Sequence, residues 1–158
     1  MSARPDDPNQ TVRQQVYLRA LGTLPNVSVH YGHFLTHQIT MPRVPVPGRR
    51  QEYVRVIKTE EKSSDVNLAT HLLHDAHTGR FELAVVVSND SDLLEPIKIV
   101  RDQLRKKVGL LNPHQRPSRA LLPHINFIKQ IRAVALRVSQ FPATMSDQHG
   151  TFTKPAAW

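Results

Sequence analysis

Cysteine is missing from the whole chain of 158 residues. Its absence excludes disulfide bonds and metal sites that bind through thiolates, and it fits the reducing cytoplasm, where we expect the protein to be located. The chain also has no apolar run long enough to span a bilayer. The stretch "SARPDDPNQ" after Met1 lacks the apolar segment of a signal peptide, so we expect no membrane partner.

Glycine motifs that cradle phosphates are missing too. There is no GxGxxG pattern and no phosphate-binding loop, and Gly48 and Gly79 are isolated turn signals. What the chain does have is a basic balance, with a formal net charge of +8 and a pI of about 10.3. That charge favours a polyanionic partner such as RNA or DNA, although solubility explains charge alone equally well.

Strand and helix periods alternate along the chain. The run 83–87, "LAVVV", has no polar residue, which is typical of a parallel strand that is covered on both faces. The alternation indicates an α/β three-layer sandwich with a mostly parallel central sheet in residues 1–142, and a disordered tail in 143–158. Three prolines predict an extended loop over 35–50. The expected helices are 11–21, 64–77, 93–104 and 129–139, and the expected strands are 26–31, 52–58, 83–87, 108–111 and 125–128.

Three carboxylates are predicted to meet at one edge of this sheet. Asp90 and Asp92 directly follow the strand 83–87, at the end where open α/β sheets bind their ligands. Asp65 falls in the first turn of the helix 64–77, on the apolar stripe that should face the sheet. Like charges this close need a neutralising partner, and carboxylate oxygens suit Mg²⁺ or Mn²⁺. Such an ion can activate water for in-line attack on a phosphodiester.

Each of these carboxylates also has a purely structural explanation. Asp92 could cap a helix together with Glu95 three residues further on. Asp90 could be a turn residue, and Asp65 could be an acid in the first turn that interacts favourably with the helix dipole. The combination of all three favours a site over three separate structural roles. The basic residues that are candidates for phosphate contact are Arg43, Arg49, Arg50, Arg105, Lys106, Lys107, Arg116 and Arg119.

Four segments together resemble a known family: "KTEEKSSDVNLATHLLHDA", "FELAVVVSNDSDLLEPIKIV", "KKVGLLNP" and "SQFP". They closely resemble the NYN domain family of PIN-like proteins, which are regarded as metal-dependent ribonucleases. The resemblance covers about residues 3–142. It implies RNA cleavage with Mg²⁺ or Mn²⁺ and no organic cofactor. The acids that it implies as catalytic and metal-binding are Asp65, Asp90 and Asp92, and the candidate RNA contacts are Lys62, Ser88, Asn89, Arg49 and Arg50.

The chain departs from the family at its start. The family opens with an apolar strand ending in an aspartate, followed by a helix and a second strand, whereas "SARPDDPNQ" resembles the residues just after that second strand. The first catalytic acid would then be missing, and the neighbours of the absent central strand would lose hydrogen bonds that cost about 1–3 kcal/mol each. We therefore expect an N-terminally incomplete domain, most simply a truncated chain, with a degenerate inactive protein as the alternative.

Two functional hypotheses remain. The first is a metal-dependent ribonuclease in which water is the nucleophile, inactive if the truncation removes an essential acid. The second is a non-catalytic RNA- or protein-binding module of the same fold, which would bind RNA with strong salt dependence and without turnover. Assembly as a homodimer is left open.

Overall fold

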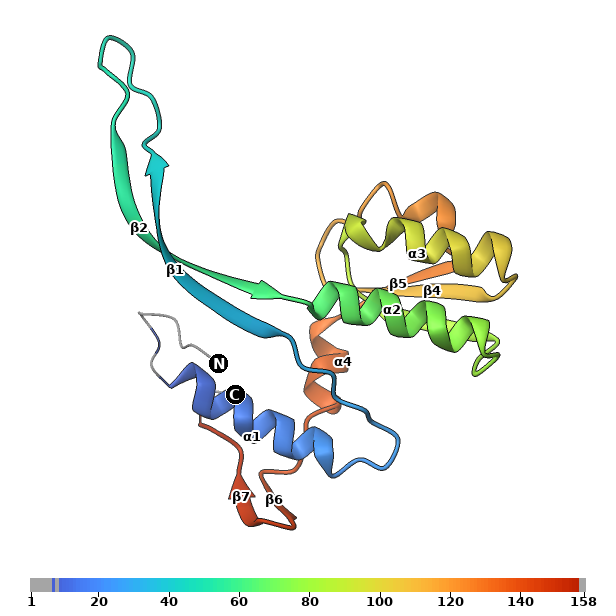
Figure 1. Ribbon diagram of the computed structural model, residues 1–158. Coiled ribbons are helices and arrows are strands. Elements are labelled where there is room, and N and C mark those ends of the chain that lie inside the picture. The colour runs from blue at the N-terminus through green and yellow to red at the C-terminus, as the bar shows by residue number, and fades with distance from the viewer. Residues whose placement is uncertain (1–6, 8, 157–158) are drawn as a thin grey trace. The chain divides into compact units, whose positions relative to one another are not determined.

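The computed structural model describes Asp7 and residues 9–156, and it is a mixed α/β structure (Figure 1). The chain divides into two compact units, one formed by Met1–Ser64 with Pro142–Trp158, and the other by Asp65–Phe141. The elements of the first unit are α1 (Gln10–Gly22), β1 (His33–Pro42), β2 (Tyr53–Lys62), β6 (Thr144–Asp147) and β7 (Gly150–Thr153).

The first unit contains a long hairpin in which β1 and β2 pair antiparallel, from His33 opposite Lys62 to Pro42 opposite Tyr53. The predicted strand 52–58 is confirmed and extends further, to residue 62. The predicted loop over 35–50 is wrong for 35–42, because only one of its three prolines falls in the strand, at the last position, where it need not donate to the ladder. The other two prolines lie in the connection between the strands.

Two other expectations for this unit have different outcomes. The helix predicted over 11–21 is confirmed as α1, but the strand predicted over 26–31 is wrong, since those residues form turns and irregular structure. In the expected disordered tail, residues 144–153 instead form the β6–β7 hairpin. Arg19 of α1 holds this hairpin through two hydrogen bonds to the Asp147 carboxylate, of 2.8 and 2.7 Å.

The second unit is built around a parallel three-stranded sheet of order β3–β4–β5. The predicted parallel sheet is therefore confirmed, and the strand predicted over 125–128 lies two residues further on. The elements of this unit are α2 (Ser64–His77), β3 (Leu83–Val87), η1 (Ser91–Leu93), α3 (Leu94–Lys98), η2 (Ile99–Gln103), β4 (Lys107–Asn112), η3 (Leu122–His124), β5 (Phe127–Gln130) and α4 (Ala133–Val138).

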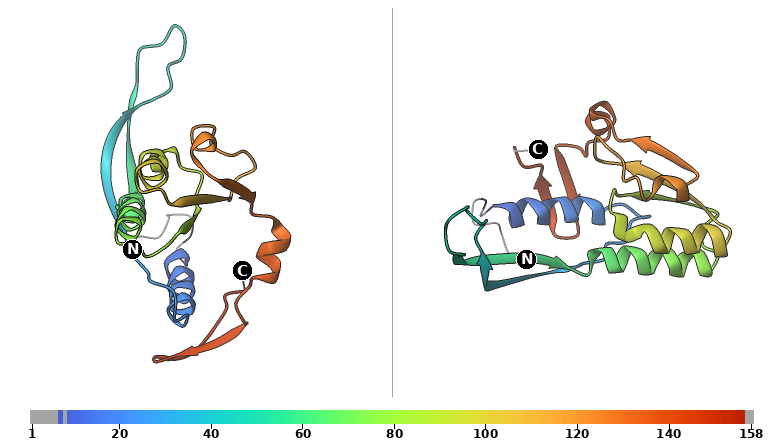
Figure 2. Two further views of the ribbon diagram at one scale, coloured as in Figure 1. Left: turned by 90° about the vertical axis from the view of Figure 1, so that its right-hand side faces the viewer. Right: turned by 90° about the horizontal axis from the view of Figure 1, so that it is seen from above.

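The helices α2 and α3 lie side by side on one face of this sheet (Figures 1 and 2). Their apolar side chains, including Leu72 and Ile97, form one core with Val86, Val108 and Leu110 of the strands. The predicted helix 64–77 matches α2 exactly, and the helix predicted over 93–104 is formed by η1, α3 and η2 in succession. The helix predicted over 129–139 is shorter, since α4 spans six residues.

The opposite face of β3 is open to solvent. Leu83, Val85 and Val87 are 44%, 46% and 58% exposed, whereas Val86 between them is 4% exposed. Among the described strands, β3 is at the edge of its sheet, next to β4 alone. Within this unit the strand is therefore covered on one face and not on both as expected, and the three-layer sandwich stays a prediction. No helix in the described part of the chain is long and apolar enough to cross a membrane.

Candidate functional site

An open hollow of about 520 Å³ lies at the carboxyl end of β3, where the sequence predicts the site. Asp65 lines it from the start of α2, and Asp90 lines it from the turn that follows β3. Two of the three predicted carboxylates thus share one solvent-filled hollow within a single compact unit. The whole lining consists of Asp65, Val87, Ser88, Asn89, Asp90, Ser91, Pro113 and His114.

The position of Asp65 follows from how α2 begins. Ser63 adopts a left-handed backbone with φ of 81°, which ends β2 and turns the chain into the helix. The carboxylate of Glu61 then accepts hydrogen bonds from the backbone N–H and the hydroxyl of Ser64, at 3.2 and 2.7 Å. Glu61 thus accepts one of the free N–H groups at the start of the helix, and Asp65, the next residue, is exposed and lines the hollow.

Asp90 has a structural role as well as a place in the hollow. Its Oδ1 accepts a hydrogen bond of 2.9 Å from the backbone N–H of Asp92, so Asp90 caps the short helix η1. The backbone N–H of Asp90 in turn donates to the hydroxyl of Ser88 at 3.0 Å. These two bonds fix the turn after β3 and hold the carboxylate of Asp90 at the sheet edge.

Asp92 lies in the first turn of η1 and is exposed, but it is not part of the lining of the hollow. The alternative that Asp92 caps a helix with Glu95 is wrong, since the residue before α3 is Leu93 and its side chain makes no cap. The capping role belongs to Asp90 instead. The structure therefore brings together Asp65 and Asp90 and leaves Asp92 beside them.

Asn89, a predicted RNA contact, uses its side-chain amide inside the protein. Its Nδ2 donates to the carbonyl of Arg116 at 3.0 Å, and its Oδ1 accepts from the backbone N–H of Ser118 at 2.6 Å. Both bonds tie the turn after β3 to the loop after β4, and that loop supplies Pro113 and His114 to the hollow.

Two residues that shape this loop were not predicted from the sequence. Asn112, at the end of β4, is fully buried, and its Nδ2 donates to the carbonyl of His114 at 2.7 Å and to Gln130 Oε1 at 3.0 Å. His114 lines the hollow. The signal that could have found them is the polar pair that follows the apolar strand 108–111, since neighbouring parallel strands end at the same edge.

The remaining candidate RNA contacts belong to the first unit. Arg49 and Arg50 lie in the connection between β1 and β2, and Lys62 is the last residue of β2. The Nζ of Lys62 is 3.5 Å from Glu60 Oε2, and Lys58 binds the other oxygen of the same carboxylate at 2.7 Å. The hydrogen bond from Lys58 is the main reason that the pKa of Glu60 is lowered, so this carboxylate stays ionised.

The oxygen ligands at the hollow suit a hydrated divalent ion in their chemistry. Asp65 and Asp90 offer hard carboxylate oxygens, and Mg²⁺ is commonly bound through one or two carboxylates while it keeps several waters. Within the described residues, however, no three histidine, aspartate or glutamate side chains come close enough to enclose an ion. Asp65 and Asp90 would therefore hold such an ion through two carboxylates, with water as its remaining ligands.

Comparison with known proteins shows to which family the chain belongs. A curated relative, the 6-hydroxy-3-succinoylpyridine 3-monooxygenase HspA of Pseudomonas putida, is 30% identical over 110 residues, which are 66% of this chain and 35% of that protein. The chain thus spans about a third of the length of this relative. A crystal structure of a protein of unknown function from Vibrio parahaemolyticus has a TM-score of 0.47 and 15% identity, covering 84% of this chain and 65% of that one. The NYN domain matches residues 27–124, which is more than half of the chain, and the chain therefore belongs to the NYN domain family.

Proposed function

We propose that this NYN domain is a metal-dependent ribonuclease that hydrolyses phosphodiester bonds of RNA. The observation that carries the proposal is the shared hollow, which Asp65 and Asp90 line from two different elements at the carboxyl end of a parallel sheet. Membership of the NYN family supports a nuclease-type fold, and the PIN-like three-layer arrangement belongs to the same proposal. The net charge of +8 supports RNA as the partner.

In this proposal, Asp65 and Asp90 would hold Mg²⁺ or Mn²⁺, and Asp92, two residues after Asp90, would be a third carboxylate from outside the lining of the hollow. The bound ion would supply an activated water and would stabilise the charge on the leaving oxygen. The chain orients Asp90 through its bond to the N–H of Asp92, and the turn is fixed against the loop after β4 by Asn89. Because the hollow is open, a polymer strand can reach the carboxylates from solvent.

The test is cleavage of labelled RNA by the full chain with added Mn²⁺ or Mg²⁺. We expect no cleavage in EDTA, and we expect Asp65→Asn and Asp90→Asn to lower the rate by about 10²-fold or more, as is typical of positioned catalytic groups. The matched control is Glu95→Gln. Glu95 lies on the neighbouring α3, is 68% exposed and pairs with Lys98 at 3.0 Å, so the variant removes a carboxylate outside the hollow. Undiminished cleavage by Asp90→Asn would refute the proposal.

A non-catalytic RNA- or protein-binding module of the same fold is the second candidate. It is favoured by one observation, that the described residues contain no group of three acids or histidines that encloses an ion. It predicts RNA binding that weakens with salt and no cleavage with either metal. The monooxygenase activity in the name of the curated relative is that protein's, and the match spans 35% of its length. A homodimer stays a prediction, which light scattering after size-exclusion chromatography would test.

A further inference from the structure

The β1–β2 hairpin, with its connecting residues 43–52, forms an exposed arm (Figure 1). All of β1 is exposed, and β2 is half-buried at three positions and exposed elsewhere. An isolated two-stranded hairpin is marginally stable at best. Binding to a partner would stabilise an arm of this length. The question is which partner its surface fits.

The end of the arm is cationic. Residues 43–55 contain four arginines against one glutamate, a formal net charge of +3. Arg43 pairs with Glu52 at 2.9 Å in a surface ion pair, which neutralises the single acid. No acidic side chain of the described residues pairs with Arg49 or Arg50. The guanidinium groups of Arg49 and Arg50 are therefore available to an anion.

The connection itself is shaped to present these charges. Gly48 adopts a left-handed backbone with φ of 77°, and prolines at 45 and 47 restrict the chain on its other side. Arg43, Arg49 and Arg50 line a small hollow of about 90 Å³. Glu52 lines the same hollow and is neutralised by Arg43, so the guanidinium groups of Arg49 and Arg50 remain to bind an anion such as a phosphate group.

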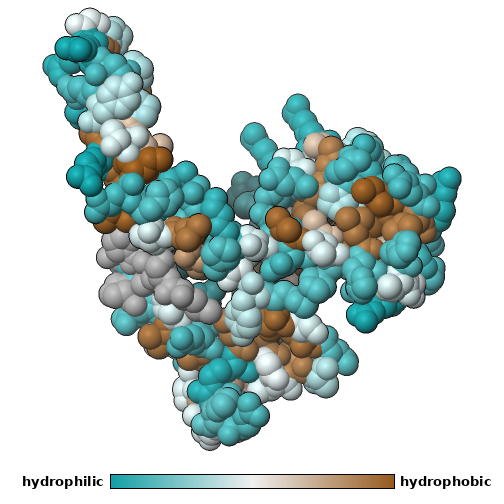
Figure 3. Space-filling view, viewed as in Figure 1, coloured by the Kyte–Doolittle hydropathy of each residue, from teal (hydrophilic) through white to brown (hydrophobic). Residues whose placement is uncertain are grey.

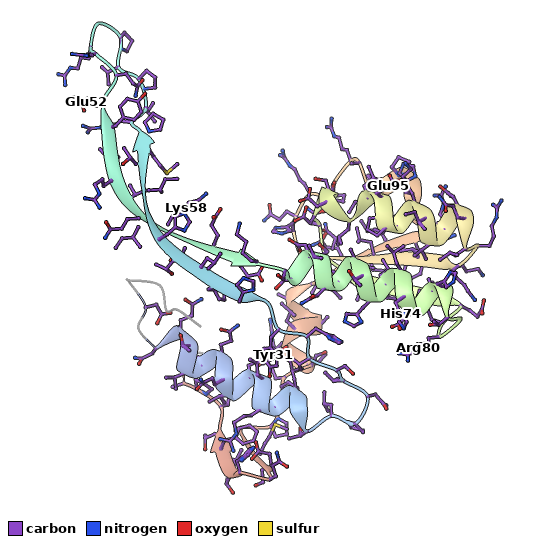
Figure 4. All side chains as sticks on the ribbon, viewed as in Figure 1. Tyr31, Glu52, Lys58, His74, Arg80 and Glu95 are labelled. Carbon is purple, nitrogen blue, oxygen red and sulfur yellow. The ribbon has the colours of Figure 1, made fainter. Side chains whose placement is uncertain are left out.

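An exposed aromatic residue follows Arg49 and Arg50 in the sequence. Tyr53 is 65% exposed at the start of β2, and Arg55 projects from the same face because side chains alternate along a strand. The guanidinium of Arg55 donates to Gln38 Oε1. Single-stranded nucleic acids bind to surfaces that combine exposed rings with arginines, since bases stack on the rings while arginines contact the backbone phosphates. Figure 4 shows Glu52 near the end of the arm and Lys58 further along β2.

Apolar side chains are also exposed on the arm, including Val44 and Val46 in its connection, which are 83% and 52% exposed. Leu35, Ile39, Met41 and Val54 lie on one face of the hairpin and are 36–49% exposed. Figure 3 shows that the end of the arm is mainly hydrophilic, while apolar side chains gather further down the strands. The cores of protein interfaces are depleted in charge, whereas the end of the arm concentrates unpaired arginines, which favours a polyanion.

We propose that the β1–β2 arm binds single-stranded RNA, with Arg49 and Arg50 on backbone phosphates and Tyr53 stacked on a base. This inference rests on the proposed function in that it takes RNA as the substrate of the same chain. The arm would add a base-stacking contact to the two arginines that the sequence predicts as RNA contacts.

The test measures binding of a fluorescent oligouridine to the full chain by anisotropy, in EDTA, so that no cleavage interferes. We expect Arg49→Ala with Arg50→Ala to lower the slope of log affinity against log salt by about 1.4, since each phosphate contact on a single strand contributes about 0.7. We expect Tyr53→Ala to weaken binding about 5- to 150-fold, the range measured for loss of a stacking platform.

The matched control is Arg132→Ala with Arg137→Ala, which removes the same charge from exposed positions on and beside α4. If this pair lowers the slope as much as the arm pair does, or if neither arm variant changes binding, the proposal is wrong. If the arm variants bind oligouridine as strongly as wild type but no longer form a complex with a protein, the arm binds a protein, and the proposal is wrong. Binding is measured without metal, so this test is independent of cleavage. RNA binding by the arm can be confirmed if the chain does not cleave RNA, and it can be refuted if the chain does.

Discussion

Replacing Asp90 by asparagine and by alanine separates its structural role from its proposed metal-binding role. The carboxylate Oδ1 accepts the N–H of Asp92 at 2.9 Å, and an asparagine keeps this acceptor while it loses the charge. Asparagine and aspartate cap helices about equally well, so Asp90→Asn should change the free energy of unfolding by less than about 0.5 kcal/mol. Asp90→Ala loses the cap and should cost about 1 kcal/mol, which is roughly 4–8 °C in Tm for a unit of this size.

The same two variants should respond alike to metal. If Mn²⁺ is present at about 100 times its Kd, wild type should gain about 2.7 kcal/mol of stability, and both variants should lose most of that gain. Thermal unfolding with and without Mn²⁺ measures both effects, and Glu95→Gln should behave as wild type throughout. A full Mn²⁺ gain in Asp90→Asn would refute the ligand role. An alanine variant as stable as the asparagine variant in EDTA would refute the capping role.

Three further predictions concern the packing around the sites. A β-carbon at Gly109 would overlap the ring of Phe127, so Gly109→Ala should lower the free energy of unfolding by about 1–3 kcal/mol in denaturant titrations, the usual cost of overpacking. Asn112→Ala removes a fully buried amide that donates to His114 and Gln130, and should cost about 0.5–1.5 kcal/mol for each bond lost, with faster amide exchange in the loop after β4. The pKa of Asp147 is lowered to about 2 from 3.8, chiefly by its hydrogen bond from Arg19. The pair should therefore hold the β6–β7 hairpin at neutral pH and release it as the pH falls through about 2, a transition that Asp147→Asn should remove from amide exchange of residues 144–153.

Periodicity predicted the elements that carry the site. The apolar stripe on 64–77 placed Asp65 in the first turn, at the end of the helix that meets the carboxyl end of β3. The spacing of Asp90 and Asp92 could not show which of them faces the hollow, because that choice depends on the single turn η1. There, one aspartate caps the backbone of the other, and this leaves Asp92 outside the lining.

Local signals failed where pairing between distant segments decided the structure. Prolines in 35–50 predicted a loop, but the ten pairs with β2 impose a strand as far as Pro42. The polar residues 144–153 predicted disorder, but the hairpin gains a contact outside its own sequence when Arg19 binds Asp147 and lies over Phe152, 4.3 Å from the ring centroid. Arg19 lies 128 residues from Asp147, and β1 pairs with the next strand of the chain, so in both cases the partner lies outside the segment whose own residues gave the prediction.

The burial of strand β3 was also predicted incorrectly from its own residues. Its uniformly apolar sequence predicted a parallel strand covered on both faces, because a run without polar residues is typical of such strands. In the described chain it is instead an edge strand with three exposed apolar side chains, and such edges promote association with other chains unless they are covered. Composition records how apolar a strand is and not which surfaces meet it. The residues of the site are therefore predictable from the end of β3, whereas the exposure of β3 depends on tertiary packing, which its own sequence does not encode.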